Sequence, residues 1–311
     1  MLENLVILFI AGIASAANPP DTIPTCESEG PKQNKTLFLQ LRSYETNKFG
    51  WTDVHSQEYN ESYLDFLISI QCQIVGRLYE NILVPDLNLS FSGQFAQHID
   101  RNSRPVIGRR YNPKLFLRFG SDTSVFSANI GYAHESNGQS LSDSAKYSEL
   151  MSDNSQKSNA ASVEETISRG WDYIDIIAIR NFENAKLSFN ARYYLDGGLL
   201  QNRAENRNSW EIYGKNISRK YIDDAIIELE LKNSLPWSYF HGKIQHNALI
   251  LKGAMGLTLG NWPKPGYFEV EEHLQLFLPV YLNMHRGYLS SVAGYSILSW
   301  SFGAGLYLDS F

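Results

Sequence analysis

Nine consecutive residues carry the clearest structural signal in the chain: Ile130-Gly131-Tyr132-Ala133-His134-Glu135-Ser136-Asn137-Gly138. In an extended strand, alternate side chains lie on the same face. One face is apolar and ends in polar groups, with Phe126, Ala128, Ile130, Tyr132, His134 and Ser136. The other face is small and polar, with Ser127, Asn129, Gly131, Ala133 and Glu135. A transmembrane β-barrel strand, apolar outside and polar inside, gives this pattern and would place Tyr132 in the interfacial aromatic girdle.

The composition of the whole chain agrees with strands rather than helices. The 311 residues include 18 Tyr, 16 Phe and 22 Gly but only 4 Met, which favours short strands and tight turns. The net charge of −6 argues against a nucleic-acid partner, which would need basic surfaces. The mean hydropathy of −0.29 is compatible with a membrane barrel, because a polar lumen and wet loops lower the average.

The first 17 residues are expected to be a secretory signal peptide. An apolar core from Leu5 to Ala11 precedes Ala14-Ser15-Ala16, a small-x-small cleavage site. Glu3 stands where a basic residue is usual, so a buried first strand or an anchor is the alternative. Residues 18–36 are expected to be a polar periplasmic segment. The two cysteines, Cys26 and Cys72, are too few for a disulfide framework; export would permit a bridge, and Cys72 also suits a small apolar filler.

No window is apolar for long enough to form a transmembrane helix, so any crossing of a membrane must use strands. We expect strands at 37–43, 62–75, 86–97, 113–119, 123–136, 171–180, 185–195, 222–231, 243–259 (one or two), 267–278, 280–293 and 297–308. The predicted fold is an antiparallel transmembrane β-barrel of about twelve strands over 37–311, with a long external loop at 139–167. Periodicity alone would also allow a soluble β-sandwich. The chain ends in Phe311, with Tyr307 four residues before it, and this ending resembles the signal by which bacterial outer-membrane barrels are recognised for assembly.

A serine and a histidine on one strand face are candidates for nucleophilic catalysis, because the imidazole must reach the hydroxyl to accept its proton. A third group must hold the ring. Beyond the polar loop, Asp172 shares a strand face with Ile174 and Ile176, so antiparallel pairing could bring it to His134. The spacing alone favours ordinary rim residues for His134 and Ser136, because isolated H-x-S is common and triads are recognised by geometry.

Two motifs together resemble those of the bacterial outer-membrane phospholipase A family. They are Tyr132-x-His134-x-Ser136-Asn137-Gly138 and Ser168-Arg169-x-Trp171. The segments Ser103-x-Pro105 and Tyr111-x-Pro113-x-Leu115-Phe116-Leu117 are also similar to the family, and Tyr44-x-Thr46-Asn47 is a weaker match. The resemblance implies a twelve-stranded barrel with a Ser-His-Asn triad on its outer face. Ser136 would be the nucleophile and His134 the base. Asp172 stands where the best-known members have asparagine.

The resemblance also implies a calcium ion bound by oxygen ligands. These would be the Ser168 hydroxyl, the Gln139 carbonyl, and the carbonyl of Ser103 of the partner subunit in a homodimer. The Gly138 N–H, together with calcium-bound water, would stabilise the oxyanion. The insertion at 140–167 separates Gln139 from Ser168 far more than in the family.

The leading hypothesis is therefore a calcium-dependent outer-membrane phospholipase A, of A1/A2 and lysophospholipase type, acting on phospholipids that reach the outer leaflet. A second hypothesis is an inactive barrel serving as a pore or structural protein, motivated by lumenal charges such as Glu228 and Glu230. A third is a soluble secreted esterase, which the absence of a G-x-S-x-G elbow weakens.

Overall fold

The computed structural model describes residues 41–56, 60–76, 84–99, 107–121, 124–138, 149, 152, 170–195, 199, 225–234, 237–258, 261–287 and 298–308. All of these belong to one compact unit, Gln40–Phe311. The expected signal peptide at 1–17, the segment at 18–36, Cys26 and Phe311 lie outside the described residues. So does the expected loop at 139–167, except for two of its residues.

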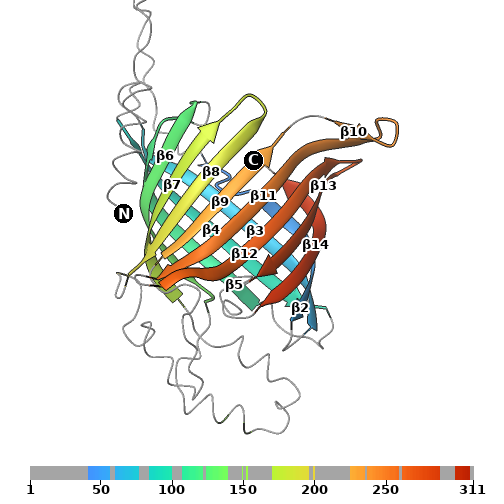
Figure 1. Ribbon diagram of the computed structural model, residues 1–311, viewed down its shortest axis with the longest axis horizontal. Helices are drawn as coiled ribbons and strands as arrows, with labels where there is room; N and C mark the ends of the chain where they lie inside the picture. The colour runs from blue at the N-terminus through green and yellow to red at the C-terminus, as the bar shows by residue number, and fades with distance from the viewer. Residues whose placement is uncertain are drawn as a thin grey trace, which may run out of the picture. The chain divides into compact units, whose positions relative to one another are not determined.

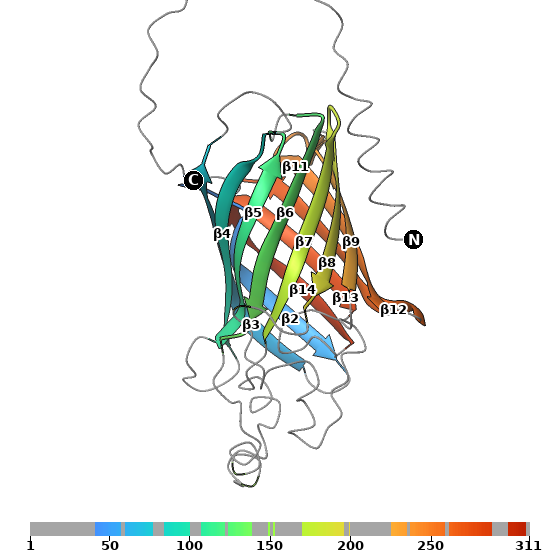
Figure 2. The same cartoon turned by 90° about the vertical axis from the view of Figure 1, so that its left-hand side faces the viewer.

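The described residues form a single antiparallel sheet (Figures 1 and 2). Its strands are β1 (Leu41–Arg42), β2 (Asn47–Ser56), β3 (Asn60–Val75), β4 (Asp86–His98), β5 (Ile107–Phe119), β6 (Phe126–Ser136), β7 (Gly170–Asn181), β8 (Ala185–Tyr194), β9 (Ala225–Asn233), β10 (Ser238–Tyr239), β11 (Ile244–Thr258), β12 (Asn261–Gln275), β13 (Pro279–Gly287) and β14 (Ser299–Leu308).

Twelve of these strands are long and close on themselves. Neighbours follow the order β3-β2-β14-β13-β12-β11-β9-β8-β7-β6-β5-β4, and β4 pairs with β3 to complete the ring. The two-residue strands β1 and β10 are short additions that pair with β3 and β11. Closure removes the sheet edges, as a chain that spans a membrane with strands requires. The expected twelve-stranded antiparallel barrel is confirmed.

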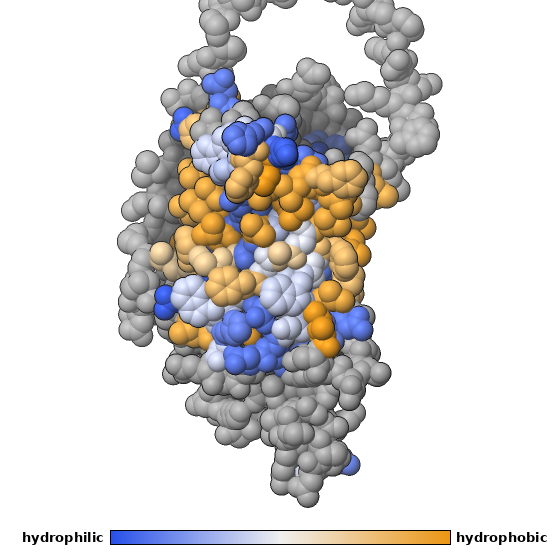
Figure 3. All heavy atoms as spheres, turned by 90° about the vertical axis from the view of Figure 1, so that its right-hand side faces the viewer, coloured by the Kyte–Doolittle hydropathy of each residue, from blue (hydrophilic) through white to orange (hydrophobic). Residues whose placement is uncertain are grey.

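The wall of the barrel is apolar outside and polar inside. In β3, Ile68 and Ile70 are exposed, whereas Ser69 and Gln71 are buried. The same alternation in β9 exposes Leu229 and turns Glu228 and Glu230 towards the lumen. Figure 3 shows the resulting apolar band on one wall. The polar interior accounts for the low mean hydropathy of a chain that crosses a membrane with strands.

The two longest connections between strands lie at the same end of the barrel. At one end, the connections between neighbouring long strands are residues 76–85, 120–125, 182–184, 234–243 and 276–278. At the other end, residues 137–169 separate β6 from β7, and residues 195–224 separate β8 from β9. In outer-membrane barrels the longer connections are extracellular. The end of β6, where Ser136 lies, is on the side of these two long connections, which in an outer-membrane barrel is the extracellular side.

Several predicted strands differ from the observed ones. Strand β2 was not predicted, because its outward positions include Asp53 and His55 and its apolar alternation is broken. The run at 243–259 is one strand, β11, with register shifts rather than two strands. Strand β12 starts at Asn261 rather than 267, and Leu276–Leu278 form the turn that follows it. No helix in the described part of the chain is long and apolar enough to cross a membrane.

Candidate active site

Strands β6 and β7 bring the predicted histidine and aspartate together. Their register pairs His134 with Asp172 and Ser136 with Gly170. On the same face, Ile130 and Ile176 are exposed to the outside, whereas Asn129 and Glu135 on the other face line the lumen. Tyr132, His134, Ser136 and Asp172 therefore lie on the outer wall, as the alternation along β6 predicted.

A hydrogen bond joins the imidazole to the carboxylate. His134 Nδ1 lies 2.6 Å from Asp172 Oδ1. Asp172 is fully buried, and the His134 side chain is only 14% exposed. Because Nδ1 is engaged by the carboxylate, Nε2 is the ring nitrogen that remains to accept a proton from a hydroxyl. This is the orientation that a general base beside a serine needs.

The second carboxylate oxygen of Asp172 is also occupied. The Tyr132 hydroxyl donates to Oδ2, and the same hydroxyl accepts a hydrogen bond of 2.8 Å from the Leu199 N–H. A buried carboxylate is costly unless its oxygens are satisfied. Tyr132 therefore does more than mark the membrane interface, because it fixes the group that orients His134. The sequence placed Tyr132 on the correct face but gave no signal for this contact.

Gly170 leaves space in front of Ser136. A Cβ atom at this position would lie 3.2 Å from Ser136 Cβ and 3.3 Å from His134 Cε1. Ser136 and His134 thus border the same small volume on the outer wall. Gly170 is the first residue of β7, and the motif Ser168-Arg169-x-Trp171 did not specify a residue at this position.

The backbone of His134 is held from inside the barrel. Between the register pairs Tyr111–Ser136 and Lys114–Ala133, Pro113 comes opposite His134 and has no N–H to give to the ladder. The His134 carbonyl accepts a hydrogen bond of 2.8 Å from Asn112 Nδ2, and Asn112 also donates to the Tyr173 hydroxyl at 2.8 Å. Asn112 therefore ties β6 to the lumenal network.

Two residues with an irregular backbone follow Ser136. Asn137 is fully buried, and Gly138 has φ +64°, a conformation that favours glycine. A Cβ atom at position 138 would overlap the Tyr111 ring. Because Gly138 comes two residues after Ser136, its N–H is a candidate donor to an oxyanion.

The proposed calcium ligands Ser103, Gln139 and Ser168 lie outside the described residues. Within the described part of the chain, no group of three or more His, Cys, Asp or Glu side chains could hold a metal ion. Asp172 has both carboxylate oxygens engaged.

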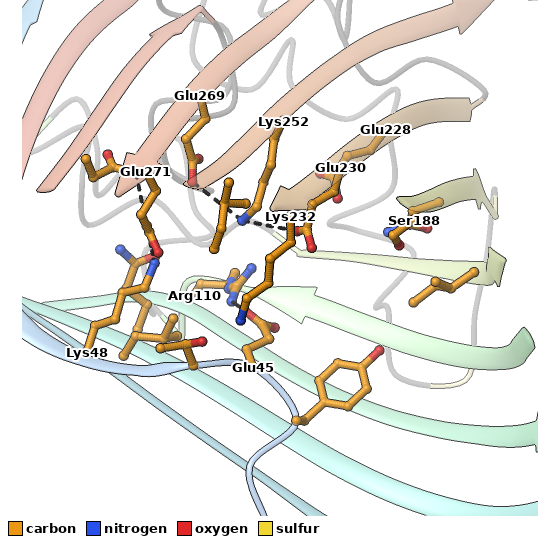
Figure 4. A pocket seen from close by; sticks show the side chains of 18 of the residues that line it. Glu45, Lys48, Arg110, Ser188, Glu228, Glu230, Lys232, Lys252, Glu269 and Glu271 are labelled. Carbon is orange, nitrogen blue, oxygen red and sulfur yellow. Dashed lines mark hydrogen bonds and ion pairs between the residues drawn. The ribbon is translucent and has the colours of Figure 1, made fainter. Parts of the chain in front are cut away.

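The lumen contains a cavity of about 590 Å³ with charged walls (Figure 4). Ion pairs connect its sides: Lys48 with Glu271, Arg110 with Glu45 at 2.7 Å, and Lys252 with Glu269 at 3.5 Å. The two glutamates that motivated the pore hypothesis are also engaged. Tyr267 donates to Glu228, and Glu230 lies 3.7 Å from Lys252. These charged side chains therefore pair with one another, or with Tyr267, inside the barrel.

Comparisons with known proteins support the fold. No protein-family model matches the chain, and no curated protein matches it. Outer membrane phospholipase A from Escherichia coli is structurally similar, with 18% sequence identity and a TM-score of 0.55, over 86% of this chain and 93% of that one. The Salmonella typhi outer membrane phospholipase dimer with bound calcium is also similar, with 16% identity and a TM-score of 0.55, over 89% of this chain and 94% of that one.

The predicted resemblance is thus confirmed at the level of the fold. The structure is a closed barrel of twelve long strands, apolar outside and charged inside, and it matches outer-membrane barrels over most of its length. The fold is therefore the one that the sequence predicted.

Proposed function

We propose that the protein is an outer-membrane phospholipase A that hydrolyses acyl esters of phospholipids in the outer leaflet. The observation that carries this proposal is the His134–Asp172 pair, which lies beside Ser136 on the lipid-facing wall at the extracellular end. A polar triad is costly on a surface that faces lipid unless it has a function. The same groups facing the lumen would have been ordinary parts of its polar network.

In the proposed mechanism, His134 Nε2 accepts the proton of the Ser136 hydroxyl as its oxygen attacks the ester carbonyl. Asp172, held by Tyr132, keeps the ring oriented and stabilises the imidazolium. The imidazolium then returns the proton to the departing alcohol, which leaves an acyl-serine. Water, deprotonated by His134, hydrolyses that ester and releases the fatty acid. The Gly138 N–H donates to the oxyanion in both steps.

Asp172 replaces the asparagine that the family resemblance leads one to expect, and the geometry accommodates it. A carboxylate accepts the Nδ1–H as an amide oxygen would, and its charge favours the imidazolium. Its second oxygen needs a donor, which Tyr132 supplies. The substitution is therefore compatible with activity.

Calcium is part of the proposal, with Ser168, Gln139 and Ser103 of the partner subunit as its ligands. A bound calcium ion would supply positive charge for the oxyanion. Sharing the ion between subunits would make activity depend on homodimerisation. The structurally similar Salmonella typhi protein is a dimer with bound calcium, which supports this part of the proposal.

The test is release of fatty acid from phosphatidylethanolamine in detergent, with calcium and with a chelator. The variant Ser136→Ala should lose activity, and chelation should lower the activity of the unaltered protein. Ser127→Ala is the matched control, because Ser127 is on the same strand but faces the lumen and is buried. Full activity of Ser136→Ala would refute the mechanism. Conductance without labelling by a fluorophosphonate would favour the pore hypothesis instead.

A further inference from the structure

Arg286 is a cation on the outer wall of the barrel, far from the candidate active site. Arg286 is exposed and is the second-last residue of β13. Its register partners are Phe268 on β12 and Trp300 on β14, and both of these are exposed as well. The next outward residues on β13 and β14 are apolar, Met284 and Phe302, whereas β2 brings His55 opposite Trp300 and Asp53 opposite Phe302. Figure 3 shows this wall, where an apolar band gives way to pale and blue residues towards the lower end.

Arg286 and the candidate active site lie at the same end of the barrel and would therefore meet the same membrane leaflet. Arg286 lies at the end of β13 that corresponds to the Ser136 end of β6, on the side of the longer connections. Six neighbour steps separate β13 from β6 in either direction around the ring: through β14, β2, β3, β4 and β5, or through β12, β11, β9, β8 and β7. Arg286 therefore faces outer-leaflet lipid on the wall opposite Ser136.

The guanidinium is held against the wall instead of pairing with an acid. Its centre lies 4.4 Å from the centroid of the Trp300 ring, a cation–π contact. Among the described residues, no carboxylate forms an ion pair with Arg286. The acid on the neighbouring rim, Asp53, is already occupied by His55 at 2.8 Å and by the Ser62 hydroxyl at 2.7 Å. A cation on a lipid-facing wall is unfavourable unless it finds a partner at the interface.

We propose that Arg286 and Trp300 form a binding site for the phosphate group of an outer-leaflet lipid. The planar guanidinium can donate two parallel hydrogen bonds to phosphate oxygens, a geometry that lysine lacks. Trp300 orients the guanidinium, and Phe268 and Phe302 offer apolar surface to the lipid chains. The ligand is a phosphate-bearing lipid rather than free phosphate, because the apolar neighbours contribute only when chains are present.

The site can be tested by native mass spectrometry of the full chain in detergent, with ether-linked phosphatidylglycerol as the probe. This lipid has no ester to cleave, so the result does not depend on the proposed hydrolytic activity. The variant Arg286→Gln should bind the probe about tenfold more weakly, because a charge-assisted hydrogen bond is lost. Arg286→Lys keeps the charge and the fold, and its affinity for the probe should lie between those of the unaltered protein and Arg286→Gln. Ether-linked diacylglycerol analogues, which lack phosphate, should bind the unaltered protein and Arg286→Gln equally weakly.

Arg180→Gln is the matched control. Arg180 is also exposed and outward, and it stacks on Phe126 and Phe182 at 5.0 Å each, but it lies at the end of the barrel with the short turns. An equal loss of binding in Arg180→Gln would show general attraction to cations and overturn a specific site at Arg286. Complete displacement of the lipid by inorganic phosphate would overturn the lipid assignment. Unchanged binding in both Arg286 variants would also refute the proposal.

Discussion

The substitution Gly170→Val tests whether the open space on the outer wall is the approach to the serine. A Cβ atom at Gly170 would lie 3.2 Å from Ser136 Cβ and 3.3 Å from His134 Cε1, which is tight for carbon contacts. Alanine would require those neighbours to move by a few tenths of an ångström. Valine adds two methyl groups in the same volume, and they would displace the side chains further or fill the space that the ester must enter.

The expected loss of activity follows from the displacement of the reacting groups. A displacement of about 1 Å from a reactive geometry costs on the order of 10²-fold in rate. We therefore expect Gly170→Val to lower kcat/KM for fatty-acid release by about 10²-fold, and Gly170→Ala to lower it by only a few-fold. Valine suits a strand, and replacing glycine there removes a destabilisation of about 0.5–1 kcal/mol. Thermal unfolding should thus show no large loss of stability.

A glycine elsewhere in the barrel provides the control. Gly253 lies in β11, and a Cβ atom there would meet nothing within 4 Å. Gly253→Val should keep full activity. The assays are fatty-acid release, fluorophosphonate labelling and thermal unfolding of all three variants. Full activity of Gly170→Val, or an equal loss in Gly253→Val, would refute the assignment of this space as the substrate approach.

Two further predictions concern the groups that hold His134. Asp172→Asn should keep more activity than Asp172→Ala, since the amide oxygen still accepts the Nδ1–H and the resemblance implies asparagine at this position, whereas Asp172→Ala should lose more than about 10²-fold. Equal activity of the two variants in the fatty-acid assay would contradict the role of Asp172. In Asn112→Ala, the His134 carbonyl and the Tyr173 hydroxyl both lose a hydrogen-bond donor. This variant should lower kcat by about tenfold without raising KM, and it should destabilise the barrel by about 1–3 kcal/mol. A loss of stability with unchanged kcat would show that Asn112 acts only on the fold.

The sequence was most informative where alternation was clean. In β6 the outward row from Phe126 to Ser136 correctly gave the face of the serine and histidine, because side chains in a strand alternate with period two. The pairing of Asp172 with His134 followed from the antiparallel arrangement of two strands joined by a loop. Strand β2 escaped prediction because outward Asp53 and His55 interrupt its apolar row, and their mutual contact is visible only in the fold.

Contacts that depend on register or on closure of the barrel were not predictable in the same way. Asn112 reaches His134 through the wall only because Pro113 comes opposite the histidine. Tyr132 meets Asp172 across two strands, although 40 residues separate them in sequence. In the lumen, Glu45 meets Arg110 only once the sheet has closed. Alternation places such side chains on a face, but it does not say which partners they meet.

The most direct test of the catalytic proposal is to map the covalent adduct of a fluorophosphonate that carries a long acyl chain, with the protein in lipid vesicles. If the Ser136 hydroxyl is the nucleophile and faces lipid, mass spectrometry should find the adduct on Ser136, and His134→Ala should abolish it. A water-soluble fluorophosphonate should label the same residue more slowly. An adduct on another serine, or labelling of Ser136 that persists without His134, would contradict a lipid-facing Ser-His-Asp site.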